Sequence, residues 1–578
     1  EKTKPLVPRD RAVTVRERLG PAGEVLTPLD DGSVREAAAI LRREEVESVA
    51  VCLLHAYVNP AHERRVGAIL AEELPGVPVS LSAEVAPEFR EYLRASTTVI
   101  NAVIRPVVER YLERIEHRLT DAGIEAKLLV MQSSGGVFSS EAARSRPVFM
   151  VESGPAAGVI ASAYLGETLG RPDILSFDMG GTTAKVGLIQ DGRPSVTKDY
   201  NVGGHASAGI GGLSLSGYPV RTPVVDLVEI GAGGGSIAWV DSGGLLRVGP
   251  RSAGADPGPV CYRNGGAAPT VTDANVVLGR LNPSYFLGGE IGLDVEGARR
   301  AIEERCAKPL GLSVVEAANG IVEIANAAMV NALHLISVQR GYDPRDFVLV
   351  GFGGAGPVHA NALMREAEMP TLVIPQSPGI FSATGLLTTD LKRDAAVTIM
   401  RRLDELDPAE AEATFAQLEH AGRQELEREG IAADAIEFSR QIDLRYVGQS
   451  YELTILAGEG MLERFHAEHD RVYGFAAPAE PVEAVSLRLT SVGRIAKPPA
   501  RPLETGGDAA PKEHRPVYFA ETGDYVDCPI YDRYALSAGS SFTGPAVVEE
   551  LDSTTVVHPG FTVLVDDLGN LVIETESA

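Results

Sequence analysis

The chain has 578 residues, of which 44% are hydrophobic and 23% charged, and this composition is typical of a folded protein rather than a disordered chain. Its 53 Lys and Arg residues against 79 Asp and Glu residues give a formal net charge of −26. Such an excess of acidic residues argues against binding to nucleic acid or to an anionic membrane, because both require a positive protein surface.

The cysteines and the apolar stretches indicate the cellular compartment of the protein. The four cysteines are widely spaced and form no C-x-x-C pair, which argues against a disulfide framework or a structural zinc site. The most apolar stretch, 321–338, is interrupted by Glu323, Asn326, Asn331 and His334, so it falls short of the ~20 apolar residues that span a bilayer. The opening Glu-Lys-Thr-Lys does not resemble a signal peptide. We therefore expect a cytoplasmic protein.

The first predicted domain, residues 1–150, alternates helices with short strands. Helices are predicted over 34–45, 61–74 and 105–122, and strands over 48–56 and 128–131. The 48–56 strand shows no polar alternation, which is typical of a strand covered on both faces. The pattern predicts a parallel or mixed sheet with helices on its faces.

A predicted hairpin carries the strongest motif. An apolar strand ends in Asp178, a turn of Gly180, Gly181, Thr182 and Thr183 follows shortly after, and a second apolar strand completes the hairpin. Paired glycines let backbone N–H groups approach a phosphate closely, and threonine hydroxyls add donors. An aspartate at the end of the strand can hold Mg²⁺ through water. The motif predicts a phosphate cradle, and the alternative is a glycine-rich hairpin with an incidental aspartate.

A second glycine motif follows a later strand. Gly351, Gly353 and Gly356 give the pattern G-x-G-x-x-G at the start of a predicted helix, with a further glycine, Gly354, at a variable position. A dinucleotide site of the Rossmann type also needs an acid at the end of the next strand, where this chain has Pro375. We therefore discount NAD and interpret the last three glycines as a turn that holds adenosine or phosphate at a helix N-terminus.

Glycine is densest at 231–235, and polar residues near this segment are candidates for a substrate pocket. These candidates are Glu229, His205, Asp256 and Asp273. Dense glycine is entropically costly on folding, so it indicates backbone placed close to another group. A set of irregular loops explains the pattern equally well.

The chain changes in character after the second predicted domain, 151–395. An acidic helix is predicted over 407–429, strands over 436–456, and a linker over 496–511. Short strands between turn residues from 516 to 576 predict a β-rich module at the end of a third domain, 396–578.

Seven short segments, in consistent order over nearly the whole chain, match one family pattern. They lie at 91–98, 151–158, 177–183, 252–261, 350–359, 377–383 and 544–550. Together they resemble the hydantoinase A/5-oxoprolinase family, which also includes the nucleotide-binding subunit of acetone carboxylase.

The resemblance implies an α/β, actin-like ATPase fold with two lobes of ribonuclease-H type. It also implies ATP and Mg²⁺ as cofactors and a hydantoinase B-type partner subunit in a hetero-oligomer. On this analogy, 178–183 is the second phosphate-binding loop and 353–356 is the adenosine-binding loop. The first phosphate-binding hairpin of the family has no counterpart from Glu1 onward.

We therefore expect ATP-dependent ring opening of a cyclic amide such as a hydantoin, N-methylhydantoin or 5-oxoproline, through phosphorylation of its carbonyl oxygen. Asp178 would organise Mg²⁺, while Thr182 and Thr183 would donate to phosphate oxygens. Two alternatives remain open. One is the nucleotide-binding subunit of an acetone carboxylase-like ketone carboxylase. The other is an actin-like regulatory protein without catalysis, because the first hairpin is missing.

Overall fold

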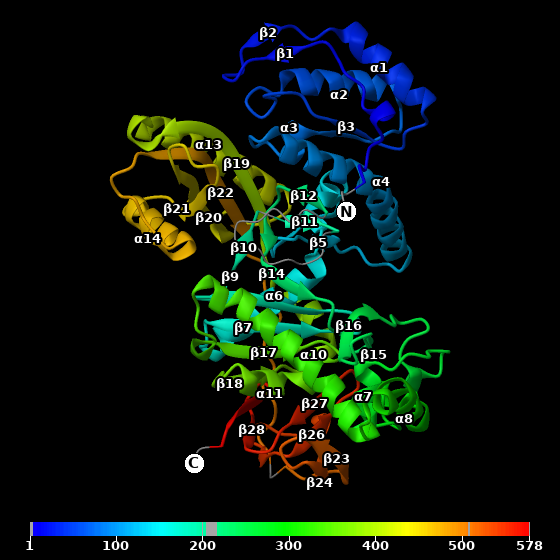
Figure 1. Ribbon diagram of the computed structural model, residues 1–578. Coiled ribbons are helices and arrows are strands. Elements are labelled where there is room, and N and C mark those ends of the chain that lie inside the picture. The colour runs from blue at the N-terminus through cyan, green and yellow to red at the C-terminus, as the bar shows by residue number, and fades with distance from the viewer. Residues whose placement is uncertain (1–3, 199, 204–216, 507–508, 577–578) are drawn as a thin grey trace. The chain divides into compact units, whose positions relative to one another are not determined.

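The computed structural model describes residues 4–198, 200–203, 217–506 and 509–576, and it shows a mixed α/β protein (Figure 1). The chain divides into two compact units, each assembled from three stretches. Unit 1 comprises Glu1–Ala156, Val196–Val224 and Thr389–Ala496, and unit 2 comprises Ala157–Ser195, Val225–Thr388 and Lys497–Ala578. The predicted domains 1–150, 151–395 and 396–578 are contiguous, whereas the compact units are not.

The N-terminal part of unit 1 alternates helix and strand as predicted. Its elements are α1 (Asp31–Arg43), β3 (Val49–Val51), α2 (Ala61–Glu73) and β4 (Val79–Leu81). Asp30 caps α1 by accepting hydrogen bonds from two amides of the first turn. β3 and β4 pair in parallel, and one apolar core joins them to both helices. The predicted 48–56 strand is thus confirmed only over its first residues.

The largest sheet of unit 1 has six strands and combines strands from the first and the last stretch of the unit. Its order is β21 (Leu453–Leu456), β20 (Ile436–Tyr446), β22 (Val482–Gly493), β19 (Leu391–Arg402), β6 (Val137–Ser139) and β5 (Leu129–Met131). Helices α13 (Pro408–Arg428) and α14 (Met461–Tyr473) pack against it, while α4 (Glu91–Asp121) precedes β5. The predicted 407–429 helix and 436–456 strands are confirmed, and α4 begins well before the predicted 105.

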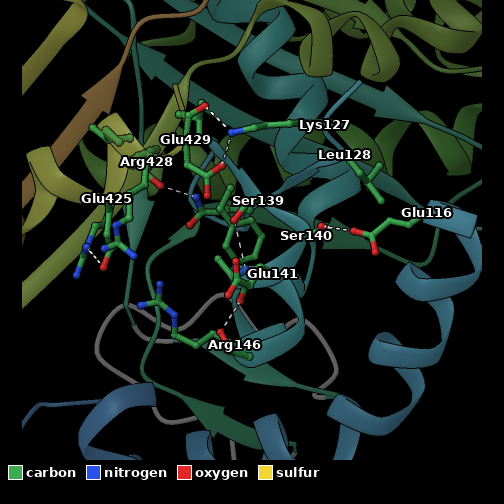
Figure 2. A pocket seen from close by; sticks show the side chains of 18 of the residues that line it. Glu116, Lys127, Leu128, Ser139, Ser140, Glu141, Arg146, Glu425, Arg428 and Glu429 are labelled. Atoms are coloured by element: carbon green, nitrogen blue, oxygen red, sulfur yellow. Dashed lines mark hydrogen bonds and ion pairs between the residues drawn. The ribbon is translucent and has the colours of Figure 1, made fainter. Parts of the chain in front are cut away.

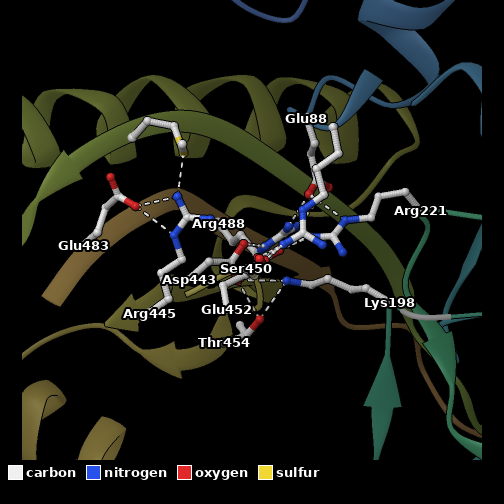
Figure 3. Close-up of polar contacts among 12 residues, drawn as sticks. Glu88, Lys198, Arg221, Asp443, Arg445, Ser450, Glu452, Thr454, Glu483 and Arg488 are labelled. Carbon is white, nitrogen blue, oxygen red and sulfur yellow. Dashed lines mark hydrogen bonds and ion pairs between the residues drawn. The ribbon is translucent and has the colours of Figure 1, made fainter. Parts of the chain in front are cut away.

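A cluster of charged side chains is buried in unit 1 where distant chain segments meet (Figure 3). Arg488 pairs with Glu88 and with Asp443, whose Oδ2 lies 2.5 Å from the Arg488 Nε. Arg221 Nε lies 3.5 Å from Glu88 Oε2, and Lys198 Nζ lies 2.9 Å from Asp443 Oδ1. Burial acts to raise the pKa of Asp443, but its cationic neighbours outweigh burial and hold that pKa at about 2. The cluster therefore consists of mutually compensating charges.

Unit 2 contains a nine-stranded sheet. In order it has β14 (Leu227–Ile230), β8 (Ala184–Gln190), β7 (Ile174–Met179), β17 (Val348–Phe352), β18 (Thr371–Ile374), β29 (Leu571–Thr575), β28 (Phe561–Val565) and β25 (Ser541–Thr543), with β9 (Arg193–Pro194) paired to β8. β7, β17 and β18 run parallel to one another, and both flanks of this trio are antiparallel.

The C-terminal stretch is rich in strands, as the sequence predicts, but it is not a separate body. β25, β28 and β29 extend the large sheet of unit 2. The remaining strands, β23 (Glu513–Phe519), β24 (Asp524–Asp532), β26 (Ala546–Glu549) and β27 (Thr554–Val557), form a second sheet. One apolar core joins both sheets. In the described part of the predicted 496–511 linker there is no helix or strand, only an isolated bridge at Thr505.

Helix α10 (Val314–Ile336) is the central helix of unit 2. Among the described residues, it lies in the one helical span long and apolar enough to cross a membrane, 314–340, and 56% of its most apolar window is buried within the protein. Ile321, Met329 and Leu333 are fully buried in the core, and α10 and α11 (Gly356–Glu366) contact each other and strands of the sheet. These contacts are those of a core helix.

Candidate functional site

β7 and β8 form a regular antiparallel hairpin, paired from Ile174 with Ile189 to Met179 with Ala184. β7 is buried along its length except for half-buried Asp178 near its end. The tip, 180–183, is closed by a 3.2 Å hydrogen bond from Gly180 N to the Thr183 carbonyl oxygen. The predicted order of strand, aspartate, glycine turn and strand is confirmed.

The second glycine turn lies directly beside this hairpin tip. β17 runs parallel to β7 with Phe352 level with Asp178, so the turn that follows β17 meets the end of β7. Gly353 has φ +85°, and a Cβ there would lie 2.5 Å from Asp178 Oδ1. Ala355 N donates to the Met179 carbonyl oxygen at 3.0 Å, and α11 begins immediately afterwards. Only glycine permits both this backbone conformation and this close approach.

The third glycine cluster supports the hairpin tip from another side. Gly234 N donates to the Gly180 carbonyl oxygen at 3.0 Å, and Gly235 N donates to that of Gly181 at 2.6 Å. A Cβ at Gly233 would lie 2.6 Å from the backbone nitrogen of Thr182. Dense glycine indicates backbone placed close to another group, and here that group is the backbone of the hairpin tip. These contacts hold the tip in place.

Several backbone donors remain available around the three segments. Within the described residues, the N–H groups of Gly181 and Thr182 donate no hydrogen bond. A Cβ added at Gly180 or Gly181 would meet nothing within 4 Å, so space is open over the tip. α11 starts without a side-chain cap, which leaves the positive end of its dipole uncompensated by a side chain. The free amide of Gly181 lies beside this open space, and free backbone amides suit an anion such as phosphate.

The charged side chains at the hairpin form a linked set. Asp178 faces Lys185 across the two strands. Burial raises the pKa of Asp178 to about 6, and Lys185 opposes this rise. Lys185 Nζ donates to Thr183 Oγ1 at 3.0 Å and lies 3.3 Å from Glu229 Oε1. One ammonium, ion-paired with Glu229, therefore lies near two carboxylates beside the tip, which leaves an excess of negative charge for a cation.

Sequence reasoning missed Lys185 as a site residue. Its signal is a single charge in the otherwise apolar 184–189 strand. It also missed a C-terminal loop that reaches the second turn, where Ser553 Oγ lies 3.4 Å from the Gly354 carbonyl oxygen. In that loop, burial raises the pKa of Glu550 to about 7 against the opposing effect of Arg533.

The four predicted pocket residues lie in different places. Glu229 lies on β14, paired with Lys185 on the hairpin. Asp273 is fully buried and caps a short helix, and its carboxylate accepts hydrogen bonds from the backbone amides of Cys261 and Thr270 at 2.8 Å and 2.9 Å. Asp256 is exposed in a loop, and His205 lies outside the described residues. The structure therefore places Glu229 beside the hairpin. The Asp273 carboxylate instead accepts hydrogen bonds at the start of its own helix.

The donors present fit a magnesium–nucleotide complex. Within the described residues, no three or more His, Cys, Asp or Glu side chains are grouped to hold a metal ion. Mg²⁺ is commonly held by one or two carboxylates together with water and substrate phosphates. Asp178, with Glu229 nearby, supplies such a set, and the free amides of the tip suit the phosphates.

Comparisons with known proteins cover almost the entire chain. The N-terminal region of hydantoinase/oxoprolinase matches 1–74, hydantoinase/oxoprolinase matches 94–395, and its C-terminal domain matches 405–572. An uncharacterised protein of Methanocaldococcus jannaschii is 45% identical over 99% of this chain and 84% of its own length. Caprolactamase subunit alpha of Pseudomonas jessenii is 36% identical over 97% of this chain and 81% of its own length.

Solved structures agree with the sequence comparisons. The crystal structure of the ATP-dependent caprolactamase from P. jessenii matches with a TM-score of 0.89 and 35% identity, over 100% of this chain and 84% of that one. A nucleotide-free structure of acetone carboxylase, from work on ATP-dependent acetone carboxylation, matches with a TM-score of 0.78 and 29% identity. The match covers 99% of this chain and 82% of that one. These matches confirm the resemblance inferred from the seven short segments, and the chain belongs to the hydantoinase/oxoprolinase family.

Proposed function

We propose that this chain is the nucleotide-binding subunit of an actin-like enzyme that uses ATP to open a cyclic amide such as a hydantoin, N-methylhydantoin or 5-oxoproline. The convergence of three glycine segments on one hairpin tip, with a free amide beside open space, carries the proposal. The ATP-dependent caprolactamase, similar over the whole of this chain, supports it. A hydantoinase B-type subunit is its proposed partner, because the caprolactamase relative is also a subunit.

The residues of the site have distinct proposed tasks. Asp178 holds Mg²⁺ through water. Thr182 and Thr183 donate to phosphate oxygens together with the amides of the tip, and the turn at 353–356 receives the adenosine. Lys185 orients Thr183 through their hydrogen bond. When bound, Mg²⁺ neutralises charge that develops on the transferring phosphoryl group.

Phosphorylation overcomes the low reactivity of an amide. The lactam oxygen attacks the γ-phosphorus and ADP leaves, which makes the ring carbon electrophilic. Water adds to this carbon, the C–N bond breaks as nitrogen takes a proton, and a second water releases phosphate from the opened product. One ring opening therefore consumes one ATP and two waters and yields one ADP and one phosphate.

Magnesium-dependent nucleotide binding is expected to weaken as pH falls below about 6. The folded-state pKa of Asp178 lies above its usual 3.8, so the carboxyl takes up a proton below about pH 6 and loses the charge that Mg²⁺ requires. The apparent affinity for Mg²⁺–ATP should then fall by up to about tenfold per pH unit. Calorimetric titrations from pH 5 to 8 measure the affinity for Mg²⁺–ATP. In the Asp178→Asn variant, the change of affinity with pH reports protonation of the nucleotide alone. Equal slopes in the two proteins would contradict the assignment of Asp178.

The function is tested with the chain and its B-type partner combined. Ring opening of hydantoin, N-methylhydantoin and 5-oxoproline is followed with and without ATP, together with ADP release. We expect ring opening of at least one substrate only with ATP, with one ADP formed per ring opened. Ring opening that proceeds equally well without ATP would overturn the proposal.

A ketone carboxylase subunit is the second candidate, because the acetone carboxylase structure matches 99% of this chain. The same assay with acetone and bicarbonate separates the two functions. Bicarbonate-dependent ADP release with the ketone, without opening of any cyclic amide, would favour carboxylation.

A further inference from the structure

Unit 1 contains two adjoining cavities of about 730 Å³ and about 550 Å³, of which Figure 2 shows the larger. Both volumes lie within the range of small-molecule sites, roughly 300–1,000 Å³. The residues that line both cavities define what we term the shared hollow: Ser145, Arg146, Phe149, Arg393, Asp394 and Glu425.

Arg146 is the unusual residue of this hollow. It follows the short helix α5 (Ser140–Ser145), and Figure 2 shows its side chain extending among the residues that line the cavity. Its guanidinium lies 5.6 Å from the centre of the Phe149 ring. Within the described residues, this guanidinium has no ion pair and no hydrogen bond, and burial lowers its pKa. The side chain is half-buried, and its guanidinium nitrogens remain accessible from the cavity. Glu84, which lines the smaller cavity, attracts the guanidinium but forms no ion pair with it among the described residues.

The acids that line the shared hollow are already engaged. Glu425 pairs with Arg393. Asp394 Oδ1 accepts a hydrogen bond from Thr490 Oγ1 at 2.6 Å, and its Oδ2 accepts one from Ser134 Oγ at 3.3 Å. Within the described residues, no acid of the shared hollow therefore forms an ion pair with Arg146, and Glu84 of the smaller cavity attracts it without direct contact.

Further cations add to the positive charge. Burial, with repulsion from Arg146 and from exposed Arg428, lowers the pKa of Arg393 to about 10. Arg221 and Arg488 line the smaller cavity, but both are paired with Glu88. Arg393 is paired with Glu425, so Arg146 is the cation of the shared hollow that has no ion pair among the described residues, in a protein whose net charge is −26.

We propose that the shared hollow binds a small oxyanion, either the carboxylate of an organic acid or an inorganic oxyanion, with the Arg146 guanidinium as its principal donor. The planar fork of a guanidinium matches the two oxygens of such an anion. The aromatic face of Phe149 holds the guanidinium from the side. The site belongs to unit 1 and requires no nucleotide.

Calorimetry without nucleotide tests the proposal with three ligands. They are 5-oxoproline, 2-pyrrolidinone, which is the same ring without the carboxylate, and bicarbonate. We expect binding of 5-oxoproline, of bicarbonate or of both, and none of 2-pyrrolidinone. Binding of 5-oxoproline alone identifies an organic carboxylate, and binding of bicarbonate alone identifies an inorganic oxyanion. No binding of either, or equal binding of 2-pyrrolidinone and 5-oxoproline, would overturn the proposal.

Variants place the ligand in the hollow. Arg146→Gln should weaken oxyanion binding about ten- to a hundredfold, the loss of a charge-assisted hydrogen bond. Arg118→Gln removes the same charge at an exposed position on α4 and should bind as the wild type does. Arg428 is exposed on α13, and Arg428→Gln should weaken binding several-fold because the anion loses the attraction of this charge. This variant provides the test if Arg146→Gln does not fold. Wild-type affinity in either Arg146→Gln or Arg428→Gln would exclude this site.

Discussion

The Asp178→Asn variant is expected to lose ATP-dependent turnover by about 10²–10³-fold, because charge stabilisation in a phosphoryl transfer site contributes on this scale. The folded protein should nevertheless be at least as stable as the wild type. Burial raises the folded-state pKa of Asp178 from 3.8 to about 6. The contribution of this carboxyl to the free energy of unfolding is therefore favourable at low pH and is lost as pH rises from 3.8 to about 6. At neutral pH the buried charge is therefore unfavourable, by up to about 3 kcal/mol, and asparagine removes it.

The matched control is Asp191→Asn, the same substitution at the exposed far end of the hairpin. It should retain both activity and melting temperature, and asparagine tolerates the φ of +50° found there. Turnover is measured as ADP release with the partner subunit, and stability by thermal unfolding of each variant. Turnover near the wild-type rate in Asp178→Asn would contradict the proposed task of this carboxylate.

The Arg488→Met variant is expected to destabilise unit 1 by about 3–5 kcal/mol, the usual effect of removing one partner from a buried ionic cluster. Methionine approximates the aliphatic part of arginine but leaves Glu88 and Asp443 without their shared cation. Arg221 and Lys198 remain, but they keep only their own contacts, at 3.5 Å from Glu88 and 2.9 Å from Asp443. Urea unfolding followed by circular dichroism measures the loss.

Arg494→Met provides the comparison, at the residue that directly follows the same strand. Arg494 pairs with Glu437 and Asp390, but its side chain is 57% exposed, and exposed pairs contribute about 0–1 kcal/mol. If both variants unfold at the same urea concentration, the buried cluster does not stabilise unit 1.

Local sequence patterns predicted the elements of the candidate site well. The 174–189 hairpin is recognisable because apolar strands flank a glycine turn, and the G-x-G-x-x-G segment because a strand precedes it and a helix follows. The contact of 231–235 with the hairpin tip was not predictable in detail, because backbone hydrogen bonds between distant glycines leave no local pattern. The local role of Asp273 was predictable, since the N-cap residue Thr270 stands three residues before it in the arrangement of a capping box.

Elements shaped by tertiary contacts were harder to predict. α4 begins at Glu91, although its first turns contain Thr97, Thr98 and Ile100, which have low intrinsic helix propensity. All three are buried, so packing overrides propensity. Strand pairing of β6 with β19 and ion pairs such as that of Glu88 with Arg488 join the stretches of unit 1, and neither has a signature in sequence spacing.

β18 pairs with β29, a strand about 200 residues further along the chain. The large sheet of unit 2 therefore cannot be completed until β29 has been synthesised. β18 adjoins β17, the strand that leads into the second glycine turn, yet its outer edge is covered only by residues 571–574. Until these residues leave the ribosome, that edge exposes unpaired amides and carbonyls able to recruit other nascent chains. Chaperone engagement is therefore expected to be greatest before β29 has been translated and paired with β18.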